Sequence, residues 1–121
     1  MIRLLMMIAA LAAAAPARAA IGDAQRGADV YDARCGACHS LDANRVGPAH
    51  RGVFGRKAGS APGFAYSSPL KRSKIVWSEA TLDPWLADPQ KTIKGARMAY
   101  RLGDAQERAD VIAYLKRESW R

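Results

Sequence analysis

The sequence lacks most of the features that stabilise other small protein folds. Past residue 20 it has no internal repeat, no low-complexity tract, no apolar run long enough to span a bilayer, and no strict alternation of apolar and polar residues. Such alternation is typical of half-buried β-strands, so its absence argues against a sheet protein. The chain also has only two cysteines and two histidines. A four-ligand zinc site or a disulfide framework therefore has few residues to draw on.

The N-terminus differs in composition from the rest of the chain. A short basic start precedes an apolar run over residues 4–15, which is too short to cross a bilayer comfortably. Pro16 ends the run, and an Ala-Arg-Ala cleavage pattern follows and ends at Ala19. This arrangement predicts a secretory signal peptide over residues 1–19, removed after Ala19 or Ala20. The alternative is an uncleaved membrane anchor.

The mature domain, residues 20–121, is small and basic. A domain of about a hundred residues buries a modest core and often needs a covalent or cofactor staple. Removing the signal peptide takes away Arg3 and Arg18, which reduces the basic residues from 19 to 17 against 11 acidic ones, a net charge of +6. Because export argues against nucleic acid, we expect an acidic protein surface as the partner. A merely solubilising charge is the alternative.

Both cysteines stand in one short motif, Cys35-Gly36-Ala37-Cys38-His39. This motif is typical of c-type haem attachment, in which each thiol forms a thioether with a haem vinyl group and the histidine is the proximal iron ligand. Both cysteines are then used, and no disulfide remains. The alternatives are a thioredoxin-like redox pair, which belongs near a βαβ pattern, and a zinc site, which needs four ligands. The motif predicts one haem c, covalently attached through Cys35 and Cys38.

Capping residues and apolar spacing predict an all-α domain with long loops. Asp23 can cap a first helix over residues 22–34, and Asp104 with Glu107 resembles the capping box of a last helix. The last helix carries an apolar stripe formed by Val111, Ile112, Tyr114 and Leu115. Between the two we expect short helices at 68–70 and 81–87, and irregular segments over 40–65 and 91–102.

A six-coordinate haem iron needs a second axial ligand. Met98 is the only methionine outside the signal peptide, and it lies far downstream of His39 in an irregular segment with ample reach. Its thioether would stabilise ferrous iron and raise the reduction potential. His50, the only other histidine, follows His39 too closely to reach the opposite haem face. We therefore predict Met98 as the distal ligand, with ordinary apolar packing as the alternative, and His50 as a surface or loop histidine.

The order and spacing of these segments resemble the class I cytochromes c, close to the group of mitochondrial cytochrome c and bacterial cytochrome c2. The resemblance covers about residues 22–116. It is carried by CGACH at 35–39, GPAHRGVFGRKAG at 47–59, GFAYS at 63–67, LKRS at 70–73, IVW at 75–77, WLADPQK at 85–91, RMAY at 97–100 and ERADVIAYLK at 107–116. It implies a small cytochrome c fold with four to five short helices and long loops wrapped around one haem. The N- and C-terminal helices would cross, with Gly27 and Tyr31 packed against Tyr114 and Leu115.

The resemblance also implies roles for five residues near the haem. The carbonyl of Pro48 would accept the other ring N–H of the proximal histidine and fix its tautomer. Arg56 would offset the charge of a buried propionate, and Tyr66 and Trp77 would donate hydrogen bonds to the propionates. Trp85 stands where many relatives have a tyrosine that contacts the axial methionine. Plain core packing is the alternative for each aromatic residue.

The methionine loop departs from the family pattern. It reads Lys94-Gly95-Ala96-Arg97-Met98, where relatives usually have Pro-Gly-Thr-Lys-Met. The missing proline removes a constraint on φ, and Ala96 lacks a hydroxyl that in relatives bonds a propionate. Both differences predict a less constrained loop.

Together the motif and the resemblance predict an electron carrier and not an enzyme. We expect a soluble, monomeric, periplasmic mono-haem protein of a respiratory chain that docks at its basic haem edge on acidic redox proteins or on membrane reductases and oxidases. Ten basic residues flank the motifs around that edge: Arg34, Arg45, Lys57, Lys71, Arg72, Lys74, Lys91, Lys94, Arg97 and Arg101. The alternatives are a haem c peroxidase or gas-binding protein with an open iron site, and a dedicated haem subunit of a larger dehydrogenase or oxidase complex.

Overall fold

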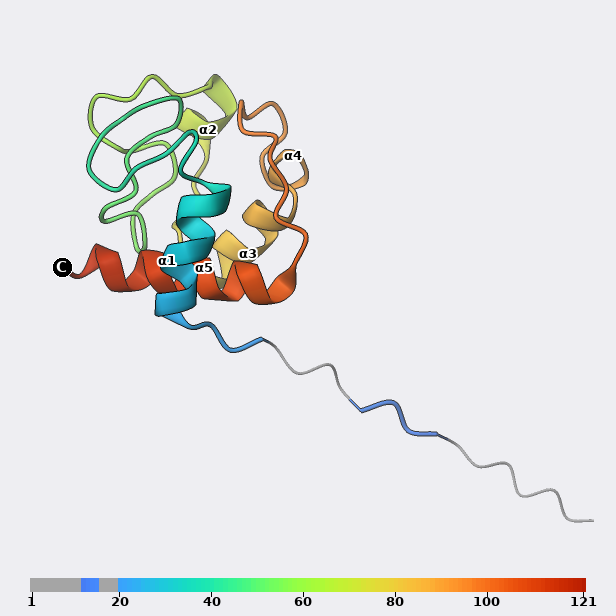
Figure 1. The fold of residues 1–121 in the computed structure, drawn as a ribbon. Helices are drawn as coiled ribbons and strands as arrows, with labels where there is room; N and C mark the ends of the chain where they lie inside the picture. Colours follow the sequence, from blue (N-terminus) through green and yellow to red (C-terminus); the bar gives the residue numbers. More distant parts are fainter. Residues whose placement is uncertain (1–11, 16–19) are drawn as a thin grey trace, which may run out of the picture.

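The computed structural model describes residues 12–15 and 20–121, and within these it contains five helices and no strand. The helices are α1 (Ala24–Arg34), α2 (Ser68–Arg72), α3 (Glu79–Ala87), α4 (Pro89–Thr92) and α5 (Ala105–Ser119). Long loops connect them (Figure 1). This confirms the predicted all-α class. Apart from 12–15, the predicted signal peptide over residues 1–19 lies outside the described residues.

The first and last helices cross, as the resemblance implies (Figure 1). The crossing is close because Gly27 has no side chain: a Cβ atom there would lie 2.0 Å from the carbonyl oxygen of Asp110. One turn further on, the rings of Tyr31 and Tyr114 are in contact, with their centroids 5.2 Å apart. Leu115, buried, completes this part of the core. The glycine therefore sets the distance between the two helices.

A buried carboxylate fixes the start of the domain to α5. Asp110 is only 3% exposed, and it accepts hydrogen bonds from the backbone N–H of Asp23 and from the side chains of Arg26 and Gln106. Gln106 also donates to the carbonyl of Ile21. These hydrogen bonds tie residues 21–26 to α5.

The helix ends follow from their caps. Asp23 and Asp104 accept from the backbone N–H groups of Arg26 and Glu107, as expected for N-caps. A capping box between Ser78 and Thr81, which the sequence analysis did not recognise, starts α3 at Glu79, two residues before the predicted start.

The segment over 91–102 was predicted to be irregular, and its beginning is instead part of α4. The Asp88 side chain caps α4 by accepting from the backbone N–H of Lys91, and Pro89 occupies the first turn. The rest of the segment has no regular structure. A proline and a capping acid are enough to form one turn here.

The core lies between α3, α5 and the loop over residues 40–65. Leu82, Trp85 and Leu86 of α3 and Val111 and Ile112 of α5 are buried there. No helix among the described residues is long and apolar enough to cross a membrane. The core does not close completely in the centre, where the loops leave a cavity.

Candidate haem site

The central cavity has a volume of about 690 Å³. Its walls come from the end of α1, from α3, from the loop over 40–65 and from the segment after α4. Eight of the nine predicted site residues line it: Cys35, Cys38, His39, Pro48, Tyr66, Trp77, Trp85 and Met98. The ninth, Arg56, is not part of the lining. Residues far apart in the sequence thus meet around one apolar space of the size that binds small cofactors.

The Cys-Gly-Ala-Cys-His segment forms a tight turn at the end of α1. Cys35 is the C-cap of α1, and its carbonyl accepts from the backbone N–H groups of Cys38 and His39. The guanidinium of Arg45 donates to three carbonyls of the turn, those of Gly36 (2.6 Å), Ala37 (3.3 Å) and His39 (3.1 Å). Arg45 therefore holds the turn in shape, a role that the sequence analysis did not assign.

The environment of Cys35 does not favour a reactive thiolate. Burial, with the nearby Cys38, raises the pKa of the Cys35 thiol to about 11. Catalytic redox cysteines need a lowered pKa. Among residues 12–15 and 20–121, no group of three or more Cys, His, Asp or Glu side chains could hold a metal ion. Both findings count against the redox-pair and zinc alternatives.

His39 has one ring nitrogen fixed and the other free. Its Nδ1 lies 2.9 Å from the carbonyl oxygen of Pro48. Since a carbonyl only accepts, Nδ1 must carry the hydrogen. Burial lowers the pKa of His39, so the ring is neutral at neutral pH and Nε2 keeps its lone pair, as an iron ligand requires.

Gly47 makes room for this arrangement. A Cβ atom there would lie 2.0 Å from Cε1 of His39, so any larger residue would displace the ring or the loop. The backbone N–H of Gly47 also donates to the carbonyl of Cys38. In the sequence, Gly47 is only the first residue of the GPAHRGVFGRKAG segment.

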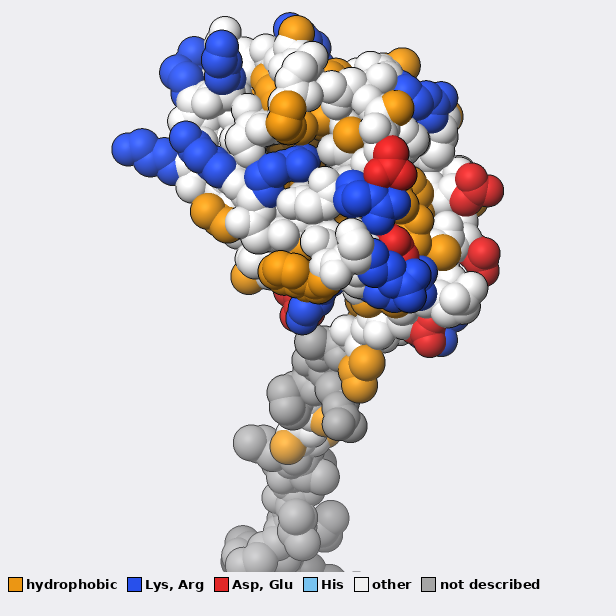
Figure 2. All heavy atoms as spheres, turned by 90° about the vertical axis from the view of Figure 1, so that its left-hand side faces the viewer, with side chains coloured by type: hydrophobic (Ala, Val, Ile, Leu, Met, Phe, Trp, Pro, Cys, Tyr) orange, Lys and Arg blue, Asp and Glu red, His pale blue; other side chains and the backbone are white. Residues whose placement is uncertain are grey.

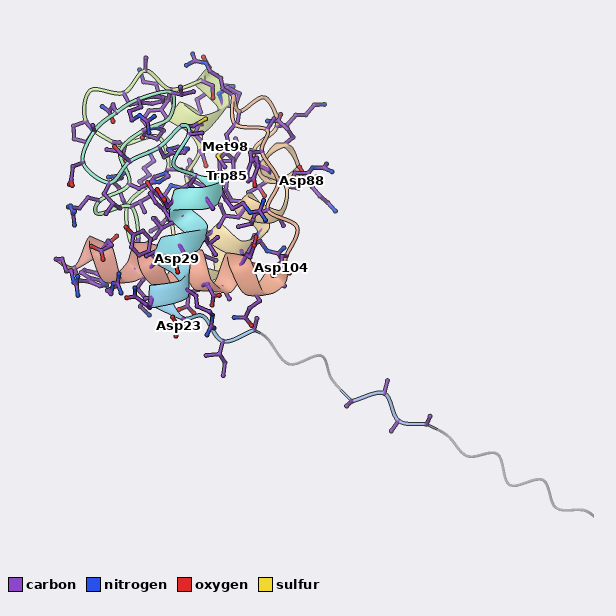
Figure 3. The ribbon with its side chains drawn as sticks, in the orientation of Figure 1. Asp23, Asp29, Trp85, Asp88, Met98 and Asp104 are labelled. Carbon is purple, nitrogen blue, oxygen red and sulfur yellow. The ribbon has the colours of Figure 1, made fainter. Side chains whose placement is uncertain are left out.

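Met98 lines the cavity from the segment after α4, and Trp85 lines it from α3 (Figure 3). The methionine loop is more constrained than its sequence predicts. The side-chain amide of Gln90 donates to the carbonyls of Ala96 (2.6 Å) and Met98 (3.0 Å) and accepts from the backbone N–H of Gly95 (3.1 Å). Hydrogen bonds from one glutamine thus constrain a loop that lacks the usual proline.

Two polar side chains of the 63–67 segment have capacity left to bond a ligand. The Tyr66 hydroxyl accepts from the backbone N–H of Ala61 (3.0 Å), which leaves its own hydrogen free to donate. Ser67, also in the lining, has a buried Oγ atom without a hydrogen-bond partner among the described residues. Buried polar atoms rarely stay unpaired, so this hydroxyl points to a polar group on the bound ligand. In the sequence, Ser67 is only the last residue of the GFAYS segment.

Arg56 lies behind the cavity wall. Its guanidinium donates to the carbonyls of Ala49 (3.1 Å) and Arg51 (3.3 Å). Its charge still reaches the site, because it contributes to lowering the pKa of His50.

His50 was predicted to be a surface or loop histidine, and it lies in the loop over 40–65 but not on its outer surface. His50 lines the cavity, and its ring stacks on that of His39 with the centroids 4.0 Å apart. The short separation of 11 residues between His39 and His50 was used only to exclude His50 as the ligand on the opposite haem face. The same short separation from His39 is what brings the two rings together.

The residues present fit a covalently bound haem. The cavity is apolar, two cysteines lie at its edge, a neutral histidine and a methionine line it, and an unpaired hydroxyl marks a polar end.

Comparison with known proteins agrees with this fit. The family model for cytochrome c matches residues 24–118. Cytochrome c of Euglena viridis is 42% identical over 98 residues, covering 78% of this chain and 96% of that protein. Cytochrome c2 of Rhodomicrobium vannielii is 43% identical over 118 residues, covering 94% and 93%. The structure of cytochrome cH from Methylobacterium extorquens has a TM-score of 0.76 and 45% identity, over 79% of this chain and 99% of that one.

The fold and site define a small helical protein built around a covalently attached haem. The chain belongs to the cytochrome c family. It carries haem c on Cys35 and Cys38, and it is an electron carrier and not an enzyme.

Proposed function

We propose that this cytochrome is a soluble, periplasmic, monomeric carrier of single electrons in a respiratory chain, with His39 and Met98 as the axial ligands. When bound, the haem supplies an iron centre that takes up and releases one electron. The observation that carries the ligand assignment is that neutral His39 and Met98 line the same cavity as the two cysteines. The thioether of Met98 favours the ferrous state and raises the potential.

The other predicted residues support the cofactor. The Pro48 carbonyl orients His39. Tyr66 and Trp77 would donate to the propionates, Trp85 would pack near Met98, and the charge of Arg56 would offset that of a propionate. Nothing in these roles requires an open iron position.

The ligand assignment is tested with Met98→Ala. The ferric wild type should show a weak far-red band from sulfur–iron ligation, and the variant should lose it, have a lower potential and bind cyanide readily. Tyr100→Phe is the matched control, because Tyr100 also lines the cavity and should leave the band in place. A far-red band that persists unchanged in Met98→Ala would reject the assignment.

Export is proposed from the N-terminal sequence. The carbonyl of Ile21 accepts a hydrogen bond from Gln106 of α5. Cleavage after Ala19 or Ala20 would leave this contact intact. N-terminal sequencing of protein from the periplasmic fraction should start at Ala20 or Ile21. A chain that retains Met1 and stays with the membrane would support the uncleaved anchor instead.

The basic residues of the predicted docking edge fall into two groups. Four arginines are engaged within the domain: Arg34 with Glu107, Arg101 with Asp88, Arg45 with the haem-binding turn, and Arg97 with the carbonyl of Ala65. Six make no ion pair among the described residues: Lys57, Lys71, Arg72, Lys74, Lys91 and Lys94. On the side of the molecule shown in Figure 2, Lys and Arg side chains are widely spread, hydrophobic side chains are exposed among them, and most Asp and Glu side chains lie toward the right.

Docking on an acidic partner should therefore depend on the second group. Lys71→Glu, at the end of α2 beside the cavity residue Leu70, should slow electron transfer at low salt and matter little at high salt, where the Debye length is short. Lys116→Glu is the control, since it makes the same charge change on α5, where Lys116 pairs with Glu79. A wild-type rate that is flat from low to high salt would reject steering and favour a fixed subunit of a complex.

A further inference from the structure

His50 is in direct contact with the proposed proximal ligand. The rings of His39 and His50 are nearly parallel, with an interplanar angle of 21° and centroids 4.0 Å apart. This is a face-to-face contact, so rotation of the His39 ring about its Cβ–Cγ bond would bring the edge of that ring into collision with His50. The Pro48 carbonyl holds only one atom of the His39 ring, Nδ1. One hydrogen bond fixes the position of Nδ1 but leaves the plane of the His39 ring less constrained. The stacking contact with His50 restricts that plane.

A tyrosine from α1 holds His50 in turn. The Tyr31 hydroxyl and His50 Nδ1 form a 2.9 Å hydrogen bond. Tyr31 is 6% exposed and packs on Tyr114 of α5, so its ring has little freedom. A ring that is held by a hydrogen bond on its edge and by a stacking contact on its face has little freedom to turn.

We propose that Tyr31 and His50 act as a positioning pair that sets the ring plane of His39 and thereby tunes the haem iron. The proposal rests on the proposed function, because it takes His39 as an axial ligand. The orientation of an axial imidazole and the polarity beside it both affect the electronic state of the metal. Without the hydroxyl of Tyr31, His50 can turn, and the plane of His39 loses its support.

The test compares four holoproteins: wild type, Tyr31→Phe, His50→Leu and the double variant. Tyr114→Phe is the matched control, because it removes a neighbouring hydroxyl that makes no hydrogen bond with His50. The readouts are the pattern of haem methyl shifts in the NMR spectrum of the ferric protein, which reports the ligand plane, and the reduction potential. Thermal unfolding of each variant identifies effects that come from stability alone.

Tyr31→Phe and His50→Leu are each expected to change the methyl-shift pattern, and Tyr114→Phe to leave it as it is. His50→Leu should raise the potential, because an apolar side chain beside the ligand stabilises the more positive ferric state less. Adding Tyr31→Phe to His50→Leu should change neither readout further, since the hydrogen bond is already gone.

Two results would overturn the inference. One is a methyl-shift pattern in Tyr31→Phe and His50→Leu that matches wild type, and the other is fully additive effects in the double variant. Either result, in a wild type with normal low-spin haem, leaves the proposed function intact. A wild type in which His39 does not ligate iron would overturn the inference and the axial-ligand proposal together.

Discussion

Replacing Gln90 by leucine should open the methionine loop while leaving the rest of the domain in place. Leucine has a similar size but removes all three hydrogen bonds that Gln90 makes to the loop, at Gly95, Ala96 and Met98. A hydrogen bond contributes about 0.5–1.5 kcal/mol net. Of the freed groups, the Gly95 N–H is exposed and regains a bond to water, whereas Ala96 is buried, so the low end of this range is a conservative value for each bond.

Three such bonds amount to about 1.5–2 kcal/mol, which corresponds to a roughly 10- to 30-fold larger open population at 1.4 kcal/mol per factor of ten. If Met98 is the distal ligand, cyanide binds ferric iron only when the loop opens. The observed rate of cyanide binding to the ferric protein should rise by the same factor. Stopped-flow absorbance measures this rate directly.

Gln106→Leu is the control for this experiment. It also removes two side-chain amide hydrogen bonds, to Ile21 and Asp110, but at the helix crossing and away from the loop. It should lower the unfolding temperature without accelerating cyanide binding. Equal cyanide rates in wild type and Gln90→Leu would refute the reasoning, because the three contacts would then contribute nothing to holding the loop.

Two further predictions concern the helix crossing. Gly27→Ala should lower the free energy of unfolding by about 1–3 kcal/mol, a typical cost of overpacking, because its Cβ atom would lie 2.0 Å from the Asp110 carbonyl oxygen. Urea denaturation measures this free energy. Gly103→Ala is the control and should be nearly neutral, because no atom lies within 4 Å of a Cβ at that position. Arg26 and the Asp23 N–H lower the pKa of Asp110 in the folded state. The carboxylate therefore stabilises the fold at pH values above its unfolded-state pKa of about 3.9. This contribution is lost as the pH falls through the lower folded-state pKa. The stability difference between wild type and Asp110→Asn should therefore be largest near neutral pH and shrink in acid; a difference that does not change with pH would contradict the role of the charge.

The parts of the structure that the sequence predicts are those encoded by local signals. Asp23 and Asp104 stand at helix starts, where their side chains can reach only nearby N–H groups. The Cys-x-x-Cys-His motif is contiguous, so its chemistry can be read without knowing the fold. Met98 followed from elimination, since no other methionine remains after residue 20.

The parts that sequence reasoning missed depend on contacts between distant segments. Gln90 resembles any polar helix residue until the chain folds back and places Ala96 and Met98 against its amide. His50 and Tyr31 lie in different elements, and nothing in either segment alone indicates that they meet. The missing proline predicted a loose methionine loop, because the sequence of the loop does not show that Gln90 bonds to it from α4.

The crossing of α1 and α5 joins the first helix of the domain to the last. A chain that emerges with its N-terminus first presents Gly27 and Tyr31 well before the partners Asp110 and Tyr114 exist, and closing so long a loop carries an entropic cost that only the complete chain can offset. Until α5 is in place, α1 and the haem-binding turn are undocked, and Cys35, half buried in the finished fold, is more exposed. We therefore expect covalent attachment of the haem to precede the docking of α5 on α1.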